Sequence, residues 1–251
     1  HRLQWREQVA WDKAHQCVTA ELRLTLGALT LERAPLPDPA GSSVMSAMIV
    51  GIRAHGIHVL PWTRALRTFQ ARVMLLHRVA AETDWPDLSD AALTRDLEAW
   101  LAPWLEGITS IKALARLDLA AALHGRLAWR RQQLLDTWAP THITVPSGSR
   151  RPIDYSADTP VLAVRLQEMF GAVETPAIAG GRLRLQLHLL SPAGRPAQIT
   201  QDLAGFWRNS YADVKKELKG RYPKHDWPDD PLTAPPTARA KSRGGSAAPA
   251  G

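Results

Sequence analysis

Cysteine is nearly absent from this sequence, since Cys17 is the only one in 251 residues. A single cysteine excludes an internal disulfide, which is typical of a protein from a reducing compartment. It also excludes a structural zinc site built from cysteines. The nine histidines are scattered, and no two have the spacing of a zinc hydrolase motif with a glutamate between them. We therefore expect no metal site.

Long apolar runs are also absent. No stretch reaches the roughly 20 apolar residues that cross a bilayer. The opening His1-Arg2-Leu3-Gln4 has neither an initiator methionine nor a signal-peptide pattern. We expect a cytoplasmic protein with no membrane partner, and we expect the chain to be a fragment whose N-terminal part is missing.

Nucleotide-binding and nucleophile motifs are missing as well. The sequence contains neither a phosphate loop, G-x-x-x-x-G-K-[ST], nor a G-x-G-x-x-G fingerprint. Ser147 lies in a Ser-Gly-Ser turn and not in G-x-S-x-G, and the acids Asp226, Asp229 and Asp230 flank prolines in a solvated turn. We therefore expect no catalytic residue and no cofactor in this chain, which argues against an independent enzyme.

What the chain has is an ordinary globular composition with a basic balance. Hydrophobic residues make up 45% and charged residues 22%, which predicts a folded protein. Lysine and arginine exceed the acids by 31 to 24, for a formal net charge of +7. A basic surface attracts phosphate polymers. The same balance also occurs in proteins of high-GC genomes, which are rich in arginine and poor in lysine. Charge alone therefore does not decide between a nucleic-acid partner and a genome-wide composition.

The first 40 residues predict barrel-like strands. Leucines alternate with polar residues over residues 22–26, which places them on one face of a half-buried strand. Gly27 predicts a bulge or sharp coil, as in small barrels. The prolines within residues 35–39 then end the sheet. We predict a partial or complete small barrel over residues 1–40.

Residues 41–139 predict a helical block, because apolar residues there recur at helical spacing. Ser42 is the expected N-cap of the first helix, and His55-Gly56 is its expected end. Asp118 is an expected N-cap further along the block.

Residues 140–231 predict a mixed domain with antiparallel strands. A hairpin is expected around the turn Pro146-Ser147-Gly148-Ser149. A helix is expected over residues 159–171, since Thr159-Pro160 resembles a helix start and Gly171 an end. Alternating leucines predict one strand over residues 182–190.

The end of the chain predicts one further helix and then a tail. The helix is expected to begin at Ser210 and to end at Gly220. Residues 232–251 are rich in alanine and proline and carry unopposed cations, so we expect a disordered basic tail. The complete prediction is an α+β chain with N-terminal strands, a central helical block and a C-terminal mixed domain.

A basic and aromatic stretch over residues 206–227 is the strongest indication of function. Rings can stack on unpaired bases while cations neutralise phosphates, the combination used for single-strand binding. The alternative is an amphipathic helix with a lysine-rich outer face and rings packed inward. Cations of the hairpin and of the leucine strand can extend the same surface, or they are simply a solvated sheet face. The candidate nucleic-acid contacts are Arg150, Arg151, Arg182, Arg184, Trp207, Arg208, Lys215, Lys216, Lys219, Arg221, Tyr222 and Lys224.

Several unusual strings resemble the C-terminal part of the HrpB family, bacterial ATP-dependent RNA helicases of the DEAH-box class. The resemblance covers nearly the whole chain and is weakest in the tail. It is carried by residues 139–149, 160–171, 189–207 and 220–225, with further likeness at Leu60-Pro61-Trp62, Trp85-Pro86-Asp87-Leu88-Ser89-Asp90 and Trp100-Leu101-Ala102-Pro103.

The resemblance implies a longer protein with its motor elsewhere. In that family two RecA-like domains precede winged-helix, helical-bundle and OB-like parts, so residues 1–40 are expected to be OB-like strands. The motor residues match no position here, so ATP and Mg²⁺ are expected in the missing motor domains. The chain is then an accessory region, inactive alone, that contacts RNA beside its own motor. The alternative is a docking module whose leucine-lined sheet and Trp62, Trp85 and Trp104 bind another protein.

Overall fold

A computed structural model describes residues 3–238 and divides the chain into two compact units. Within those residues, the first unit comprises the chain up to His77 together with Asp84–Gln132. The second comprises Arg78–Thr83 and the residues from Gln133 onward. Helices and sheets occur together, which confirms the predicted α+β class. Among the residues that the structure describes, no helix has the length and apolar character to cross a membrane.

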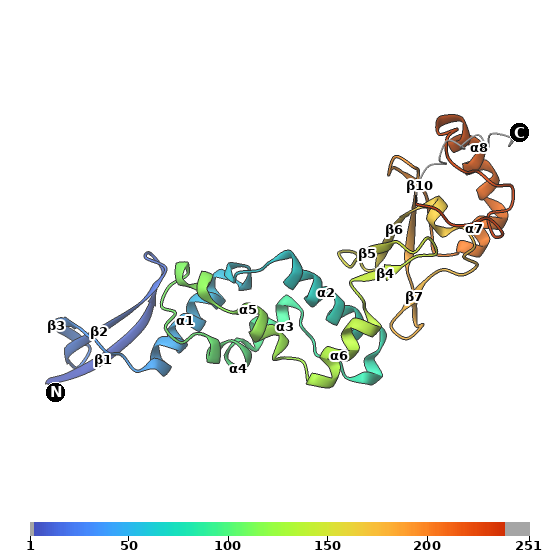
Figure 1. The fold of residues 1–251 in the computed structure, drawn as a ribbon. Helices are drawn as coiled ribbons and strands as arrows, with labels where there is room; N and C mark the ends of the chain where they lie inside the picture. The colour runs from blue at the N-terminus through green and yellow to red at the C-terminus, as the bar shows by residue number, and fades with distance from the viewer. Residues whose placement is uncertain (1–2, 239–251) are drawn as a thin grey trace, which may run out of the picture. The chain divides into compact units, whose positions relative to one another are not determined.

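The first unit begins with an open antiparallel sheet (Figure 1). Its strands, in the order β1-β2-β3, are β1 (Leu3–Asp12), β2 (Cys17–Leu26) and β3 (Leu29–Pro35). Gly27 adopts a φ of +62° in the turn between β2 and β3, while the register shifts between Leu24 and Thr25 instead. The glycine is therefore a turn residue, and the predicted bulge lies two residues earlier. β1 and β3 are not paired in the described chain, so an OB-like barrel stays a prediction.

Helix α1 (Gly41–His55) packs against this sheet through a glycine. A Cβ atom added to Gly51 would lie 2.4 Å from Cδ2 of Trp11, so the indole ring occupies the space where a side chain would stand. The helix begins one residue after Ala40, and Ser42 makes no capping hydrogen bond, so the predicted cap is wrong. Its predicted end is confirmed, because Gly56 follows it with a φ of +86°.

All regular elements between Gly41 and Trp138 are helices, as the spacing predicts. After α1 they are η1 (Ile57–Val59), α2 (Arg64–Val79), η2 (Ala81–Thr83), α3 (Asp90–Arg95), α4 (Leu97–Trp100), η3 (Ala102–Trp104), η4 (Lys112–Arg116), α5 (Leu119–His124) and α6 (Trp129–Trp138). Leu93, Leu97 and Leu101 are at most 1% exposed and contribute to the core. Asp118 accepts a hydrogen bond from the amide of Ala121, which confirms it as a cap.

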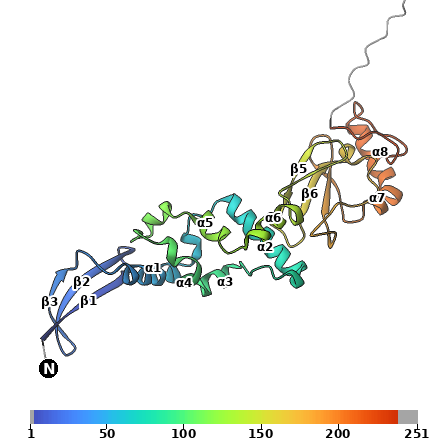
Figure 2. The same ribbon diagram turned by 60° about the horizontal axis from the view of Figure 1, so that its bottom comes forward.

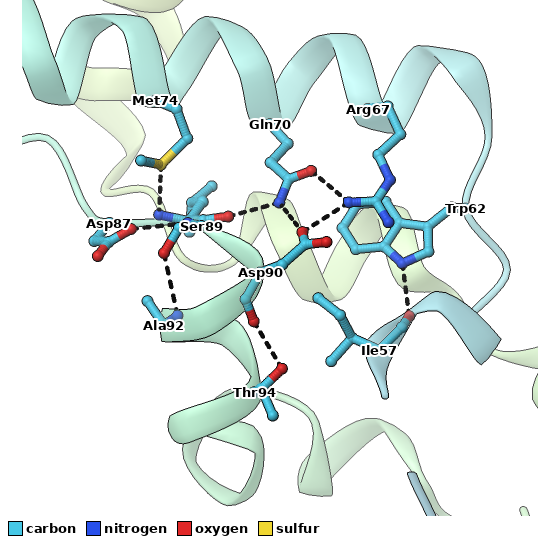
Figure 3. Close-up of polar contacts among 11 residues, drawn as sticks. Ile57, Trp62, Arg67, Gln70, Met74, Asp87, Ser89, Asp90, Ala92 and Thr94 are labelled. Carbon is cyan, nitrogen blue, oxygen red and sulfur yellow. Dashed lines mark hydrogen bonds and ion pairs between the residues drawn. The ribbon is translucent and has the colours of Figure 1, made fainter. Parts of the chain in front are cut away.

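A polar network fixes α2 against the start of α3 (Figure 3). Buried Gln70 donates from Nε2 to the carbonyl of Leu88 at 2.7 Å and to Oδ1 of Asp90 at 2.8 Å. Arg67 donates to the same Asp90 oxygen at 2.8 Å and stacks on Trp62, 3.7 Å from the ring centroid. Trp62, Leu88 and Asp90 belong to the strings that resemble the HrpB family, so part of that resemblance reflects packing within the helical block.

The second unit is built on a five-stranded mixed sheet of order β10-β9-β6-β5-β4. Its strands are β4 (His142–Thr144), β5 (Arg150–Asp154), β6 (Val161–Arg165), β9 (Gln186–Leu190) and β10 (Pro196–Thr200). β4 and β5 form the predicted hairpin, whereas β6 and β9 run parallel. Leu162 pairs with Leu187 and Val164 with Leu189, and all four side chains are buried on one face.

The helix predicted over residues 159–171 is wrong. The segment forms β6 and then a short 3-10 helix, η5 (Leu166–Met169). Burial alternates along β6, with Leu162 and Val164 inside and Ala163 and Arg165 exposed, which is a strand pattern of period two. Pairing with β9 therefore overrides the helix-start signal at Thr159-Pro160, because that pairing buries two apolar side chains.

The strand predicted over residues 182–190 is interrupted at Leu185. The amide of this buried leucine donates to the carbonyl of Pro176 at 2.9 Å, outside any ladder. The break leaves β8 (Leu183–Arg184) to pair with β7 (Ala177–Ile178), while β9 joins the main sheet. The alternation of leucines inside and polar residues outside continues through the break.

Two helices and a returning segment complete the second unit. α7 (Leu203–Asn209) and α8 (Tyr211–Arg221) lie on the same side of the sheet in both views (Figure 1, Figure 2). α8 begins after Ser210 as predicted, but the Ser210 side chain makes no capping hydrogen bond and the helix runs one residue beyond Gly220. The segment after Pro231 returns to η5, where the amide of Thr237 donates to the carbonyl of Gln167 at 2.9 Å. Of the predicted tail, residues 239–251 lie outside the described residues.

A buried ion pair joins the hairpin to η5. The side chain of Glu168 is completely buried, and Arg151 of β5 donates to it twice, from Nε at 2.9 Å and from Nη2 at 2.6 Å. The amide of Ser147 in the hairpin turn donates to the Glu168 carbonyl at 3.2 Å. A charge in this position is tolerated only with its partner, because burial of a lone carboxylate is costly.

Arg151→Ala is expected to destabilise the second unit by about 3 kcal/mol, because it leaves the Glu168 carboxylate buried without its counterion. Hydrogen exchange of β6 and η5 amides is expected to accelerate, while amides of α2 keep their protection. Arg150→Ala is the matched control, since Arg150 is exposed and forms no ion pair in the described chain. Equal exchange in the two variants would contradict a stabilising role for the pair.

Gly51→Ala is expected to loosen the N-terminal sheet from α1, although alanine favours a helix by about 1 kcal/mol. The added methyl group collides with the Trp11 ring, and such overpacking typically costs about 1–3 kcal/mol. Exchange of β1 and β2 amides measures the effect. Gly41→Ala is the control, because no atom lies within 4 Å of its added carbon. Trp11→Ala in the Gly51→Ala background is expected to remove the collision. If the effects of the two substitutions on exchange are simply additive, the packing argument is refuted.

Candidate nucleic-acid interface

The basic and aromatic stretch lies on α7, α8 and the loop that follows α8. On α8, Lys215 and Lys219 are four residues apart and share one flank of the helix, whereas Arg221 lies toward the other. Lys216 points between the flanks and is exposed. The helix therefore carries cations on more than one side, and these cations do not form a single row.

The rings of this stretch mostly belong to the core. Trp207 is 7% exposed, and its Nε1 donates to the carbonyl of Ala172 at 2.8 Å. Its ring packs with Phe170, Phe206 and Tyr211 at centroid distances of 4.9–6.1 Å. Trp207 is thus unavailable for stacking on a base, and Tyr222 is half-buried beside His225. The inward-packed alternative describes these rings better than a stacking platform does.

Four of the candidate cations are held by acids. Arg151 belongs to the buried pair with Glu168. Arg182 pairs with Glu82 at 2.8 Å and stacks on Trp138 at 4.9 Å. On α8, Lys215 pairs with Asp229, and Arg221 pairs with Glu217 at 3.2 Å. Arg151 is therefore a structural residue, while the other three are partly neutralised.

Six candidate cations are exposed and form no ion pair within residues 3–238. They come from β5, β8, α7, α8 and the loop after α8, and each has its side chain open to solvent: Arg150, Arg184, Arg208, Lys216, Lys219 and Lys224. An exposed cation without an acid partner gains most from a phosphate, because it gives up no existing contact.

Local electrostatics favour the ionised form of Asp229 beside α8. The hydrogen bond from Lys215 holds the pKa of Asp229 below its usual range, and the charge of Lys219 acts in the same direction. Burial raises the pKa of Tyr211, and the charges of Asp226 and Asp229 add to the effect. Burial and the charge of Arg165 lower the pKa of His225, so its neutral form is favoured. The positive charge of this stretch at neutral pH therefore comes from its lysines and arginines.

A small cavity beside α8 was not predicted. It has a volume of about 90 Å³, and its lining includes Ser191, Arg195, Glu217, Arg221 and Tyr222. Arg195 ends the tight turn between β9 and β10, where the amide of Ser191 donates to the Arg195 carbonyl at 2.8 Å. The turn sequence Ser191-Pro192-Ala193-Gly194-Arg195 predicts a hairpin, and that signal could have located this arginine.

The described residues also bear on the question of a metal site. Among residues 3–238, no three histidine, cysteine or acidic side chains gather in a way that could hold a metal ion. Ser147 donates to the Ser149 hydroxyl at 3.1 Å, so it has the turn role expected from its sequence. The arrangement can bind anions through its exposed cations.

Comparison with known proteins gives matches of one kind. A family model described as "ATP-dependent helicase C-terminal" matches residues 100–231, and a second, for the connector region of the ATP-dependent RNA helicase HrpB, matches residues 2–36. The chain is 47% identical over 240 residues to the ATP-dependent RNA helicase HrpB of Escherichia coli K12, covering 95% of this chain and 30% of that protein.

Two solved structures agree with this match. The crystal structure of the E. coli DExH-box NTPase HrpB aligns with a TM-score of 0.77 and 45% identity, over 95% of this chain and 30% of that one. The crystal structure of the E. coli DEAH/RHA helicase HrpB aligns with a TM-score of 0.67 and 44% identity, over 90% and 29%. The chain thus spans about 30% of the length of its relatives. It belongs to the HrpB family of ATP-dependent RNA helicases, and the part of that family it matches is the C-terminal region.

Proposed function

We propose that this chain is an accessory, non-motor region of an ATP-dependent RNA helicase that contacts RNA through the second unit. The observation that carries the proposal is the set of six exposed cations without ion pairs in the described chain, spread over β5, β8, α7, α8 and the following loop. ATP and Mg²⁺ would then act in the motor domains of the longer protein, because this chain has no phosphate loop.

The mode of contact follows from the side chains that are available. Trp207 and Trp227 are each 7% exposed, so they cannot stack on bases without unfolding their surroundings. Lysine and arginine side chains remain, and they neutralise phosphates without reading sequence. The proposed contact is therefore to the RNA backbone, which suits a region that guides any strand past a motor.

Lys216→Ala with Lys219→Ala is expected to weaken binding of a labelled single-stranded RNA and to reduce the salt slope. Two lost phosphate contacts lower the slope of log K against log salt by about 1.4. The matched control is Lys13→Ala with Lys112→Ala, which removes the same charge from exposed sites in the first unit. A salt-independent response, or equal losses in both double variants, would defeat the proposal.

A second candidate function is docking to protein, and a separate surface favours it. On one face of the N-terminal sheet, Leu3 pairs with Leu26 and Leu26 with Leu29, while Trp5 pairs with Leu24. Leu3, Trp5 and Leu29 are 56%, 49% and 67% exposed. Of the loop tryptophans predicted for docking, Trp85 is buried, Trp62 is half-buried under Arg67, and Trp104 is 40% exposed.

Trp5→Ser is expected to weaken capture of a separately prepared motor portion of an HrpB helicase by about tenfold or more, as for a central aromatic anchor. RNA affinity is expected to stay unchanged, because the substitution lies in the first unit. Trp104→Ser provides the control, since it removes an exposed ring from another surface. Retained capture by Trp5→Ser would exclude this face as the docking surface.

A further inference from the structure

The cavity between α8 and the β9–β10 turn has features that the proposed backbone contact does not use. Two arginines from different elements line it, Arg195 from the turn and Arg221 from the last turn of α8. Arg195 forms no ion pair among the described residues. Arginine is the side chain best suited to phosphate, because its planar guanidinium donates two parallel hydrogen bonds to two oxygens.

From this geometry we infer that the cavity binds a phosphate monoester, in particular the terminal phosphate of an RNA strand. Its volume of about 90 Å³ accommodates a few water molecules. That space suits a tetrahedral anion and is too small for a nucleoside. A terminal phosphate monoester carries more negative charge than a backbone phosphodiester, so it gains more from two arginines.

The surroundings of the cavity give it a rigid frame. Buried Ser191 accepts a hydrogen bond from the Arg195 amide on its hydroxyl at 3.2 Å, and its own amide donates to the Arg195 carbonyl at 2.8 Å. These two bonds fix the turn that carries Arg195. On the helix side, the Tyr222 carbonyl accepts from Nε1 of Trp227 at 2.9 Å, so the lining at the end of α8 is also held.

The negative charge of Glu217 repels an anion in the cavity. Substitutions can therefore be designed that strengthen phosphate binding as well as ones that weaken it. Glu217 is one of the lining residues, and its carboxylate pairs with Arg221 at 3.2 Å, with both side chains more than 60% exposed. Such an exposed pair stabilises the fold little, so a dianion can compete for Arg221. Removal of the Glu217 charge must then strengthen phosphate binding, whereas removal of either arginine must weaken it.

The test compares a short oligoribonucleotide with a 5′-hydroxyl, a 5′-phosphate or a 3′-phosphate, each labelled at the other end. The full 251-residue chain is expected to bind one phosphorylated end about tenfold tighter than the hydroxyl end, the value of one charged hydrogen-bonded contact. Arg195→Ala and Arg221→Ala are expected to abolish this ratio, and Glu217→Gln to increase it. Lys216→Ala with Lys219→Ala is the control, because it lowers both affinities and preserves the ratio.

This inference rests on the proposed function, because the phosphate is taken to belong to RNA. The outcomes distinguish a failure of the cavity assignment from a failure of the RNA contact. RNA binding with a ratio of one for both phosphorylated ends would overturn the cavity assignment and leave the RNA contact intact. If no RNA binds, thermal unfolding with inorganic phosphate decides. If inorganic phosphate raises the unfolding temperature of the native chain, with a smaller effect in Arg195→Ala and a larger one in Glu217→Gln, that result would support a site for free phosphate in the cavity. If phosphate does not stabilise the native chain, the proposal is wrong.

Discussion

The second unit depends on one buried charge. Glu168 lies in a 3-10 turn whose side chains are all inside, and its carboxylate has no access to water. Arg151 must therefore come from β5 to meet it, which fixes the hairpin against η5. The residues on either side of this pair then carry two further contacts, because Gln167 accepts from Thr237 and Phe170 packs into the aromatic cluster. The pair thus lies beside the contacts that join η5 to the returning segment and to α7.

The buried pair reduces the number of basic residues that are available to a ligand. A sequence shows Arg150 and Arg151 as neighbours of equal interest, yet they lie on opposite faces of one strand. Arg151 is committed to the buried Glu168 carboxylate, whereas Arg150 is exposed to solvent. On α8 the same division separates Lys215, which pairs with Asp229, from Lys216, which has no such partner among residues 3–238. The positive charge available to a phosphate polymer is thus smaller than composition indicates, and it is confined to particular faces.

Local patterns predicted the elements well where periodicity and tertiary pairing agree. The hairpin around Ser147, the helices of residues 41–139 and the alternating leucines of β9 all follow from spacing. The failure at residues 159–171 has a definite cause, since Thr159-Pro160 and Gly171 are genuine helix signals that a parallel pairing with β9 overrides. That pairing joins segments more than 20 residues apart and leaves no local trace. The cavity beside α8 was missed for a similar reason, because Arg195 and Arg221 meet only in the folded chain.

The burial of the rings limits the kind of recognition available to this region. Base stacking on Trp207 would require breaking its bond to Ala172 and opening a cluster with Phe206 and Tyr211. Phosphates, in contrast, can reach Lys216, Lys219 and Arg208 without any rearrangement. Recognition through charge depends on ionic strength and on the number of phosphates, and it is nearly indifferent to base identity. The proposed RNA contact would therefore be largely independent of sequence, because the rings that could distinguish bases are packed inside.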